Sequence, residues 1–173
     1  LPELTSFGAF HECPSPDGAG AFVADGGLYP GQNGAVGRRK PWLSANGYYS
    51  REDYKDILRY AAERHISVIP ELDIPGHSMS AIESMRHRAR TTGDESYLLT
   101  DPGDTSRFMA YLGYTDNVID PGLESSYRFI GHVLDELKAI YSEAGQTLRC
   151  VGISGDEVAE GVWLGSPACR KLM

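Results

Sequence analysis

The chain has 173 residues, of which 41% are hydrophobic and 23% are charged, and its formal net charge is −8 at pH 7. This composition is typical of a globular protein, and the negative charge argues against nucleic acid or an anionic membrane surface as the main partner. No apolar run approaches the roughly 20 residues of a membrane span. The three scattered cysteines are too few for a disulfide framework or a zinc site.

The first part of the chain is rich in glycine and proline and shows no helical or alternating hydrophobic period. We predict a long loop region over residues 1–47, followed by a helix-strand-helix-strand core over residues 48–173. Trp42, preceded by three basic residues, has two interpretations. It is either a tip that stacks on a sugar or binds an anion, or part of a solvated loop.

A helix and a strand are predicted after this loop region. Ser50 is a good N-cap, acids follow in the first turn, and apolar residues recur at helical spacing up to about His65. The β-branched run Ile66–Pro70 is typical of a short buried strand. The chain then runs into Asp73 and, after a Pro-Gly turn, into His77. Taken singly, an acid or a histidine at such a place is more often structural than functional.

Two further helices are predicted in the middle of the chain. Ser78–Arg90 has helical character, and Ser125–Ala144 carries a continuous apolar face that Gly145 ends, as a C′ glycine does. Thr91–Gly122 between them reads as a loop with repeated Asp-Pro-Gly turns. The start of another helix is predicted over Ala168–Met173, after a Ser-Pro pair.

The most informative stretch lies between these last two helices. The apolar run Leu148–Ile153 predicts a buried strand, inside which Cys150 is expected to be a small core residue. The strand ends in two adjacent acids, Asp156 and Glu157. Neighbouring side chains on a strand point to opposite faces, but Gly155 allows the backbone to turn so that both acids serve one site. The alternative is a strand-end turn with two solvated acids.

The order helix, strand, helix, strand, with right-handed crossovers, predicts parallel strands with helices outside them. Acids at the C-terminal ends of two such strands suit a (β/α)₈ TIM barrel, in which these ends form the active site. Such a barrel typically needs about 250 residues, and this chain is shorter. We therefore predict an α/β fold that is a partial TIM barrel, namely about strands 3 and 4 with long loops.

Five segments, in this order and spacing, resemble the catalytic domain of the family 20 β-N-acetylhexosaminidases: Tyr48–Tyr54, Val68–His77, Leu99–Pro102, Asp116–Pro121 and Gly155–Glu157. The resemblance covers the chain from about Leu1 to its end. It implies a region that begins just after the second barrel strand and ends just beyond the fourth.

The resemblance also implies a function. Members of this family remove terminal β-linked N-acetylglucosamine or N-acetylgalactosamine with retention, and the acetamido oxygen of the substrate acts as the nucleophile. Glu157 would then be the general acid, and Asp156 would orient the acetamido group, with Asp73 and His77 as supporting residues. No metal or organic cofactor is implied. The expected partners are N-acetylhexosamine-terminated glycans and the remaining barrel segments, and the expected location is secreted, periplasmic or lysosomal.

The sequence departs from the family pattern just before the acid pair. The family usually has histidine, an apolar residue and two glycines there, whereas this chain has Gly152 and Ser154 at the first and third of these positions. The arginine, tryptophans, tyrosine and further acids that complete the family's sugar pocket lie outside these residues. The alternative hypothesis is therefore a non-catalytic fragment or relative that at most binds N-acetylated sugars.

Overall fold

The computed structural model describes residues 1–9, 48–110 and 114–173. In chain order, the described elements are α1 (Glu3–Ser6), α2 (Arg51–Ala62), β1 (Glu71–Leu72), α3 (Met79–Thr92), α4 (Glu124–Glu143), β2 (Gly152–Ile153) and α5 (Pro167–Arg170). The described elements follow the predicted order of helix, strand, helix and strand, and α1 is an addition within the stretch predicted as loop. Trp42 and most of that stretch lie outside the described residues.

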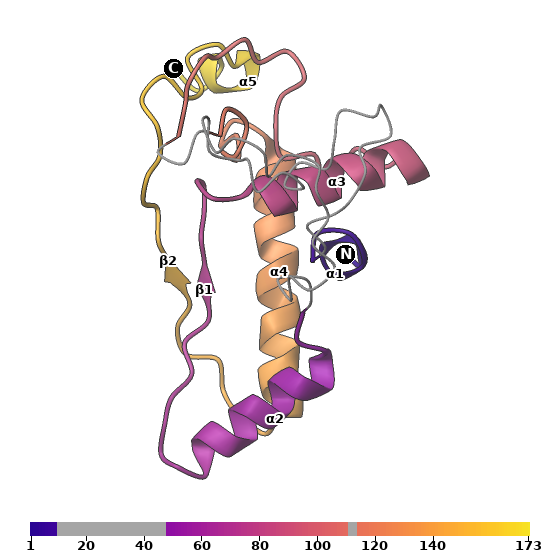
Figure 1. Cartoon of the computed structure of the whole chain (residues 1–173), viewed down its shortest axis with the longest axis vertical. Helices are drawn as coiled ribbons and strands as arrows, with labels where there is room; N and C mark the ends of the chain where they lie inside the picture. Colours follow the sequence, from indigo (N-terminus) through magenta and orange to yellow (C-terminus); the bar gives the residue numbers. More distant parts are fainter. Residues whose placement is uncertain (10–47, 111–113) are drawn as a thin grey trace, which may run out of the picture.

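The two strands form a parallel pair in which Glu71 lies opposite Gly152 and Leu72 lies opposite Ile153. The predicted parallel arrangement is therefore confirmed. Both strands run in the same direction in Figure 1, from the level of α2 towards α3 and α5. Their C-terminal ends consequently meet at one end of the molecule, which is where the predicted site residues follow in the sequence.

Helices α2 and α4 pack together at the N-terminal side of the strand pair. Ser50 caps α2 through a capping box, in which its hydroxyl accepts a hydrogen bond from the Asp53 amide and its own amide donates to the Asp53 carboxylate. Leu58 of α2 is buried against Tyr141 of α4. The Tyr141 hydroxyl also donates to the carbonyl of Val68, at 3.0 Å, so this cluster fixes the chain that leads into β1.

A second hydrophobic cluster lies near the C-terminal ends of the strands. Ile82 and Met85 of α3 are buried with Phe129 of α4, and Leu99 and Ile119 join them from the segment between these helices. Burying a side chain of this size contributes roughly 1.5–3 kcal/mol relative to leaving it exposed. The stretch predicted as a loop is therefore irregular in backbone but supplies buried core residues.

The structure corrects the boundaries of both predicted strands. The sequence predicts strands at Ile66–Pro70 and Leu148–Ile153, whereas the described strands are Glu71–Leu72 and Gly152–Ile153, with one further bond from the Gly152 amide to the Pro70 carbonyl at 2.8 Å. Within the described part of the chain each strand has one partner, so pairing holds only where these two segments approach. The prediction that Cys150 is a core residue is wrong, since it is exposed.

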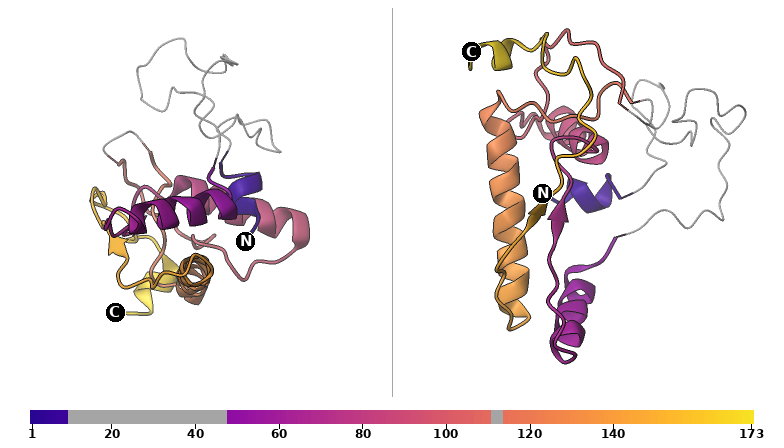
Figure 2. Two further views of the ribbon diagram at one scale, coloured as in Figure 1. Left: turned by 90° about the horizontal axis from the view of Figure 1, so that it is seen from below. Right: turned by 90° about the vertical axis from the view of Figure 1, so that its left-hand side faces the viewer.

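Helix α4 runs alongside the strand pair, with its N-terminal end near the C-terminal ends of the strands, as the views in Figure 2 show. Helix α2 lies at the opposite end of the pair, and α5 lies beyond its C-terminal ends. In the described residues, none of the helices combines the length and the apolar character that crossing a membrane requires. The C-terminal strand ends lie between α3 and α5, and this is the end of a parallel sheet at which α/β folds bind ligands.

Candidate active site

The segments that follow β1 and β2 bring four predicted residues together. The imidazole Nε2 of His77 lies 3.1 Å from a carboxylate oxygen of Glu157 and 4.0 Å from one of Asp156. Asp73, His77 and Asp156 each place one oxygen or nitrogen atom within 4.8 Å of the others. The two strand ends thus form one cluster of three carboxylates and an imidazole, and the chemical roles of these residues stay predictions.

The backbone after β2 explains how two adjacent acids face one imidazole. Gly155 has a φ of 72° and Glu157 a φ of 52°, so the chain leaves the extended conformation on both sides of Asp156. The regular alternation of a strand would send the two side chains to opposite faces. A left-handed residue at each of these positions removes that alternation. This is the consequence that the sequence predicts for Gly155.

The turn after β1 is held against the acid pair by close backbone contact. Gly76 is buried, and a Cβ added to it would lie 2.9 Å from the backbone carbonyl oxygen of Asp156. His77 follows with a φ of 49°. The Ser78 hydroxyl contacts the carbonyl oxygens of Asp73 and Gly76, at 3.1 and 2.8 Å. Glycine is therefore required at position 76 for the two strand ends to approach this closely.

The environment of the cluster alters the pKa of Asp73. Partial burial raises the pKa of the Asp73 carboxyl above its usual value, and the neighbouring Asp156 carboxylate raises it further, while His77 acts in the opposite direction. Two carboxylates at short range favour a shared proton, because each disfavours ionisation of the other. When Asp73 is protonated, it can donate a hydrogen bond to Asp156 across the two strand ends.

The same three residues have the chemistry of cation ligands. Asp73, His77 and Asp156 supply two carboxylates and an imidazole at short mutual distances. Such a group is also stable without an ion when its acids share a proton or a hydrogen bond. The sequence prediction that the site needs neither a metal nor an organic cofactor stays a prediction.

Glu71 is a site residue that sequence reasoning missed. The Ser154 hydroxyl donates a short hydrogen bond to the Glu71 carboxylate. A Cβ added to Gly152 would lie 3.3 Å from both Cγ and Oε2 of Glu71, so the Glu71 side chain occupies the space beside that glycine. The signal in the sequence is its spacing of two residues from Asp73, which places both acids on one face of the strand. Both residues that depart from the family pattern, Gly152 and Ser154, therefore lie against the Glu71 side chain.

The segment Asn117–Asp120 is a second feature that the sequence did not identify as part of the site. Asn117, Ile119 and Asp120 are nearly fully buried. The Ile119 amide donates to the Pro75 carbonyl at 2.8 Å, so this segment touches the turn that carries His77. In the sequence this segment lies within Asp116–Pro121, one of the five stretches that resemble the family, but none of its residues is predicted there as a site residue.

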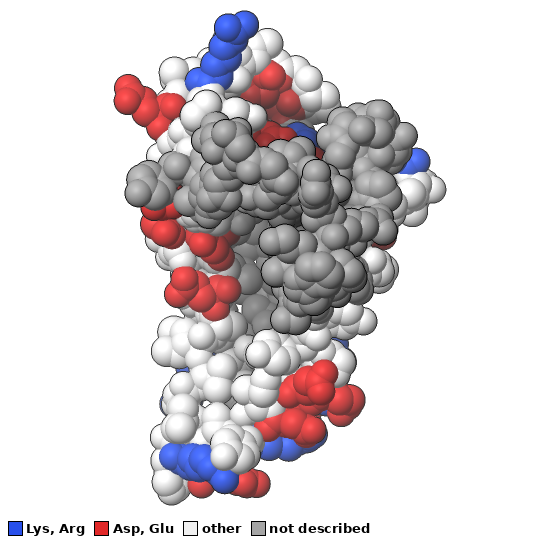
Figure 3. Space-filling view, in the orientation of Figure 1, with Lys and Arg blue, Asp and Glu red and all other residues white. Residues whose placement is uncertain are grey.

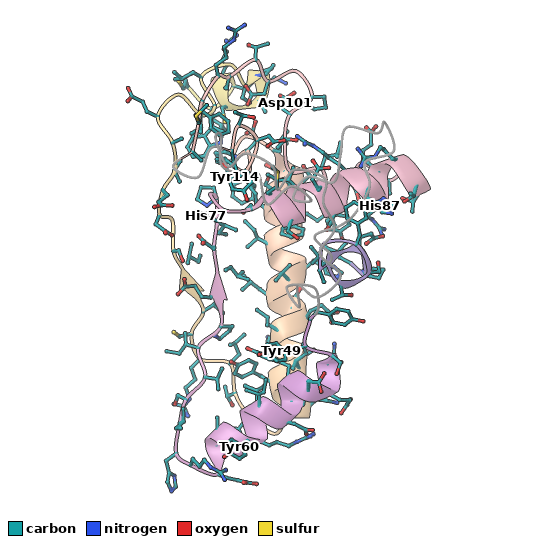
Figure 4. All side chains as sticks on the ribbon, in the orientation of Figure 1. Tyr49, Tyr60, His77, His87, Asp101 and Tyr114 are labelled. Atoms are coloured by element: carbon teal, nitrogen blue, oxygen red, sulfur yellow. The ribbon has the colours of Figure 1, made fainter. Side chains whose placement is uncertain are left out.

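The acids are accessible from one side of the molecule. The side chains of Asp156 and Glu157 are 59% and 42% exposed, whereas that of His77 is 24% exposed. Figure 3 shows acidic side chains along the edge formed by the chain after β2. In Figure 4 His77 lies at the C-terminal end of β1, at the level of this edge. The described residues alone therefore build one wall of a site, with the carboxylates open to a ligand.

The comparisons with known proteins agree on one family. The sequence model described as "Glycosyl hydrolase family 20, catalytic domain" matches residues 1–173. A β-hexosaminidase of Vibrio vulnificus is 41% identical over 187 residues, which cover 99% of this chain and 20% of that protein. β-Hexosaminidase B of Pseudoalteromonas piscicida is 37% identical over 179 residues, which cover 99% of this chain and 22% of that protein.

A solved structure is also similar to this chain. It is the family 20 exo-β-N-acetylglucosaminidase of Vibrio harveyi in complex with N-acetylglucosamine, with a TM-score of 0.62 and 39% identity. The likeness covers 74% of this chain and 18% of that one, so this chain spans about a fifth of the length of the relatives it matches. The described α/β piece with its two parallel strands thus has a TIM-barrel-related fold.

Proposed function

Because this chain belongs to glycosyl hydrolase family 20, we propose that it forms part of the catalytic domain of a β-N-acetylhexosaminidase. The reaction is the removal of terminal, non-reducing β-linked N-acetylglucosamine or N-acetylgalactosamine from a glycan or glycoconjugate. The observation that carries the proposal is the cluster at the two strand ends, where one imidazole lies within 4.0 Å of both acids of the Asp156–Glu157 pair.

The proposed mechanism assigns a separate task to each acid of the pair. Glu157 donates its proton to the glycosidic oxygen as the bond to the anomeric carbon breaks. The acetamido oxygen of the substrate attacks the anomeric carbon, and Asp156 orients this group and stabilises the positive charge that develops on it. Glu157 then removes a proton from the water that opens the cyclic intermediate, so two inversions give retention.

The other two residues of the cluster act through these acids. His77, whose Nε2 lies 3.1 Å from a carboxylate oxygen of Glu157, holds the acid in place through this contact. Asp73 fixes Asp156 from the neighbouring strand end, which the raised pKa of Asp73 beside Asp156 supports. The proposed chemistry uses side chains and the substrate's own acetamido group, without a metal or an organic cofactor.

In this proposal β1 and β2 are the third and fourth strands of an eight-stranded barrel. The helices α2 and α4 belong to its outer layer, and the C-terminal strand ends form part of its catalytic face. The partners of this chain are then the other barrel segments and the N-acetylated glycan, and nucleic acid is not a partner. By family likeness, the protein acts outside the cytoplasm, in a secreted, periplasmic or lysosomal location.

The second candidate function is binding without catalysis. It is favoured by the open site, since the side chain of Asp156 is 59% exposed in the described residues, and by the family positions occupied here by Gly152 and Ser154. An N-acetylated sugar would then contact the acids without being cleaved. The retained pair of adjacent acids favours the hydrolase, because binding alone gives no physical reason to strain the backbone at Glu157.

A comparison of two substrates tests the proposed reaction. The complete enzyme should hydrolyse an aryl β-glycoside of N-acetylglucosamine, and NMR should show the β-anomer of the free sugar as the first product. The matched aryl β-glucoside, with a hydroxyl in place of the acetamido group, lacks the internal nucleophile and should be cleaved at least about 10³-fold more slowly. Equal rates on both substrates, or an α-anomer as first product, would contradict the mechanism. Binding without hydrolysis would support the second candidate.

A further inference from the structure

The buried carboxylate of Asp120 belongs to a segment that is hydrogen-bonded to the turn carrying His77. Asp120 is 2% exposed, and its carboxylate accepts hydrogen bonds from the Ser166 hydroxyl at 2.5 Å and from the Gly122 amide at 2.7 Å. The Cys169 thiol lies 3.0 Å from the same carboxylate. Burial, and then this carboxylate, raise the pKa of the thiol, so the thiol stays protonated and can donate. The carboxylate is therefore held by three donors.

Two of these donors belong to the chain that follows the acid pair. Ser166 and Cys169 come nine and twelve residues after Glu157, at the start of α5 and within it. Trp163 adds a third contact from the same stretch, since its indole Nε1 donates to the Ile119 carbonyl at 3.1 Å. The chain after Glu157 is thus anchored to the residues around Asp120 rather than to β2 alone.

The neighbours of Asp120 hold the other half of the site. The Ile119 amide donates to the Pro75 carbonyl at 2.8 Å, and the Asn117 carbonyl accepts from the Ser78 amide at 3.0 Å. These two bonds flank His77 on either side. The segment Asn117–Asp120 therefore contacts both the turn that carries the imidazole and the chain that follows the carboxylates.

The backbone of Asp120 is also fixed within the core. Its amide donates to the Leu99 carbonyl at 2.8 Å, and its carbonyl accepts from the Ser126 hydroxyl at 2.6 Å. Leu99 and Ser126 are both nearly fully buried. Because these bonds fix Asp120 within the core, a displacement of Asp120 would also displace the turn that carries His77 and the chain that follows Glu157.

We propose that Asp120 is a positioning residue that sets the distance between His77 and the Asp156–Glu157 pair. Its hydrogen bonds in the described residues go to none of the four site residues, and it acts by fixing the turn Pro75–Ser78 relative to the chain that leaves Glu157. A displacement of about 1 Å at a reacting group can reduce the rate by roughly 10²-fold. This inference rests on the proposed function, because it assigns Asp120 to the alignment of the proposed general acid.

Asp101 provides a matched control in the same loop cluster. Its carboxylate accepts from the Ala168 amide at 3.0 Å and from the Gly103 amide at 2.8 Å, and Figure 4 shows it at the end of the molecule that holds α5. Asp101 therefore anchors α5 as Asp120 does, but the described bonds to the His77 turn come from the Asn117–Asp120 segment. If Asp120 merely stabilised α5, its substitution should have the same effect on the enzyme as the substitution of Asp101.

The test compares two substrates of the complete enzyme, because their ratio of kcat/KM does not depend on the fraction of folded protein. One is a β-linked N-acetylglucosamine disaccharide, whose leaving group needs protonation, and the other is the activated nitrophenyl glycoside. Asp120→Asn keeps the size but replaces an accepting oxygen with an amide donor. It should lower kcat/KM for the disaccharide by roughly 10-fold or more and for the nitrophenyl glycoside by about three-fold at most. Asp101→Asn should lower both equally.

The possible outcomes separate the inference from the proposed function. An unchanged substrate ratio in Asp120→Asn overturns the inference, provided that Glu157→Gln changes the ratio in the same assay. If the parent cleaves neither substrate, or if Glu157→Gln leaves the ratio unchanged, the proposed function fails and the inference fails with it. Should Asp120→Asn not fold, Ser166→Ala removes one donor to the carboxylate and should change the ratio in the same direction. An unchanged ratio in Ser166→Ala then overturns the inference.

Discussion

Glu157 and His77 share an uncommon backbone conformation. Their φ angles are 52° and 49°, in the left-handed region that residues other than glycine rarely adopt. Each such residue costs roughly 1–2 kcal/mol, and it persists only when the surrounding structure holds it. Both belong to the candidate site, and their side chains contact each other. Strain of this kind is concentrated where function requires an otherwise unfavourable side-chain direction.

The proposed role of Asp156 predicts a particular pattern of loss. Asp156→Asn keeps the shape of the side chain but removes the charge that stabilises the developing cation. The value of kcat should fall by roughly 10²-fold or more while KM changes little. A thiazoline mimic of the cyclised intermediate should bind the parent far better than N-acetylglucosamine does, and much of this advantage should be absent in the variant.

The matched control for Asp156 is Glu160→Gln, on the same segment. Glu160 is exposed, and the described residues form no ion pair with it, so its replacement should leave kcat and the thiazoline affinity unchanged. If the thiazoline binds the parent no better than the plain sugar, the substrate-assisted mechanism is wrong for this protein.

The sequence could identify the four residues at the strand ends but not the contacts that hold these ends in place. Asp73, His77, Asp156 and Glu157 follow predicted strands directly, so the strand pattern alone places them at one end of a sheet. Asp120 lies in an irregular segment, and its side chain contacts Ser166 and Cys169, which are 46 and 49 positions away in the chain. No local pattern reports such contacts. The same holds for the bond between Ser154 and Glu71, which depends on the register of the two strands.

At the level of elements, helices were predictable where local signals agree. Ser50, the acids after it and the apolar spacing all predict one helix, and α2 begins at Arg51 as expected. Gly145 has a φ of 73° and follows the end of α4, again as predicted. The strand boundaries were less predictable, because strand pairing depends on partners distant in the sequence. Ile69 and Ile153 are apolar but about 60% exposed, which a hydrophobic pattern cannot reveal.

An ion-pair network joins the two long helices. The Arg51 guanidinium of α2 contacts Glu143 of α4 at 2.6 Å and Glu136 of α4 at 2.8 Å, and Lys55 lies 3.3 Å from Glu143. The bond from Arg51 holds the pKa of Glu143 at about 2, below its usual value of 4.5. These side chains are partly exposed, so salt screens the network.

The lowered pKa of Glu143 predicts a defined pH dependence. Because the folded form has the lower pKa, the contribution of Glu143 to stability is fully present above pH 4.5 and is lost as the pH falls towards 2. In Glu143→Gln, the α2 amides should exchange with deuterium faster than in the parent at pH 6, and the difference should shrink at pH 3. Exchange read by mass spectrometry, with parent and variant compared at each pH, measures this.

The control for this experiment is Asp135→Asn on the same helix. Asp135 is exposed, and no ion pair to it occurs in the described part of the chain. Its replacement should leave the exchange of α2 unchanged at both pH values. A difference between Glu143→Gln and the parent that stays constant from pH 6 to pH 3 would contradict the role given to the ion pair.

In the part of the chain that the structure describes, the sheet has two strands, and its edges are open. Each strand pairs on one side, and Ile69 and Ile153 are 59% and 61% exposed. Helix α4 runs alongside the pair in the right-hand view of Figure 2. A closed barrel has no free edge, whereas an open sheet presents unpaired amides and carbonyls that recruit other strands. The sequence predicted the parallel strands, and in the proposed barrel the edges of this sheet would pair with other strands.

The open sheet predicts how this polypeptide behaves when it is produced alone. It should self-associate through the strand edges or be poorly ordered, and it should show no hexosaminidase activity because it forms only one wall of the site. Size-exclusion chromatography and an assay with an aryl N-acetylglucosaminide measure both properties. Ile153→Lys, which places a charge on the exposed strand, should reduce the self-association. A folded monomer that turns over substrate would show that the active site needs far less of the barrel.

Glu157 is proposed as the general acid of a glycosidase, so the dependence of kcat on the leaving group is the sharpest test of its role. In the complete enzyme, Glu157→Gln should lower kcat by roughly 10²-fold or more on a β-linked disaccharide, whose leaving oxygen needs a proton. An aryl glycoside with an activated leaving group needs little protonation, so its cleavage should be reduced much less. A large loss on the disaccharide with a small loss on the aryl glycoside is the predicted result. An equal reduction of kcat on the two substrates would show that Glu157 is not the general acid.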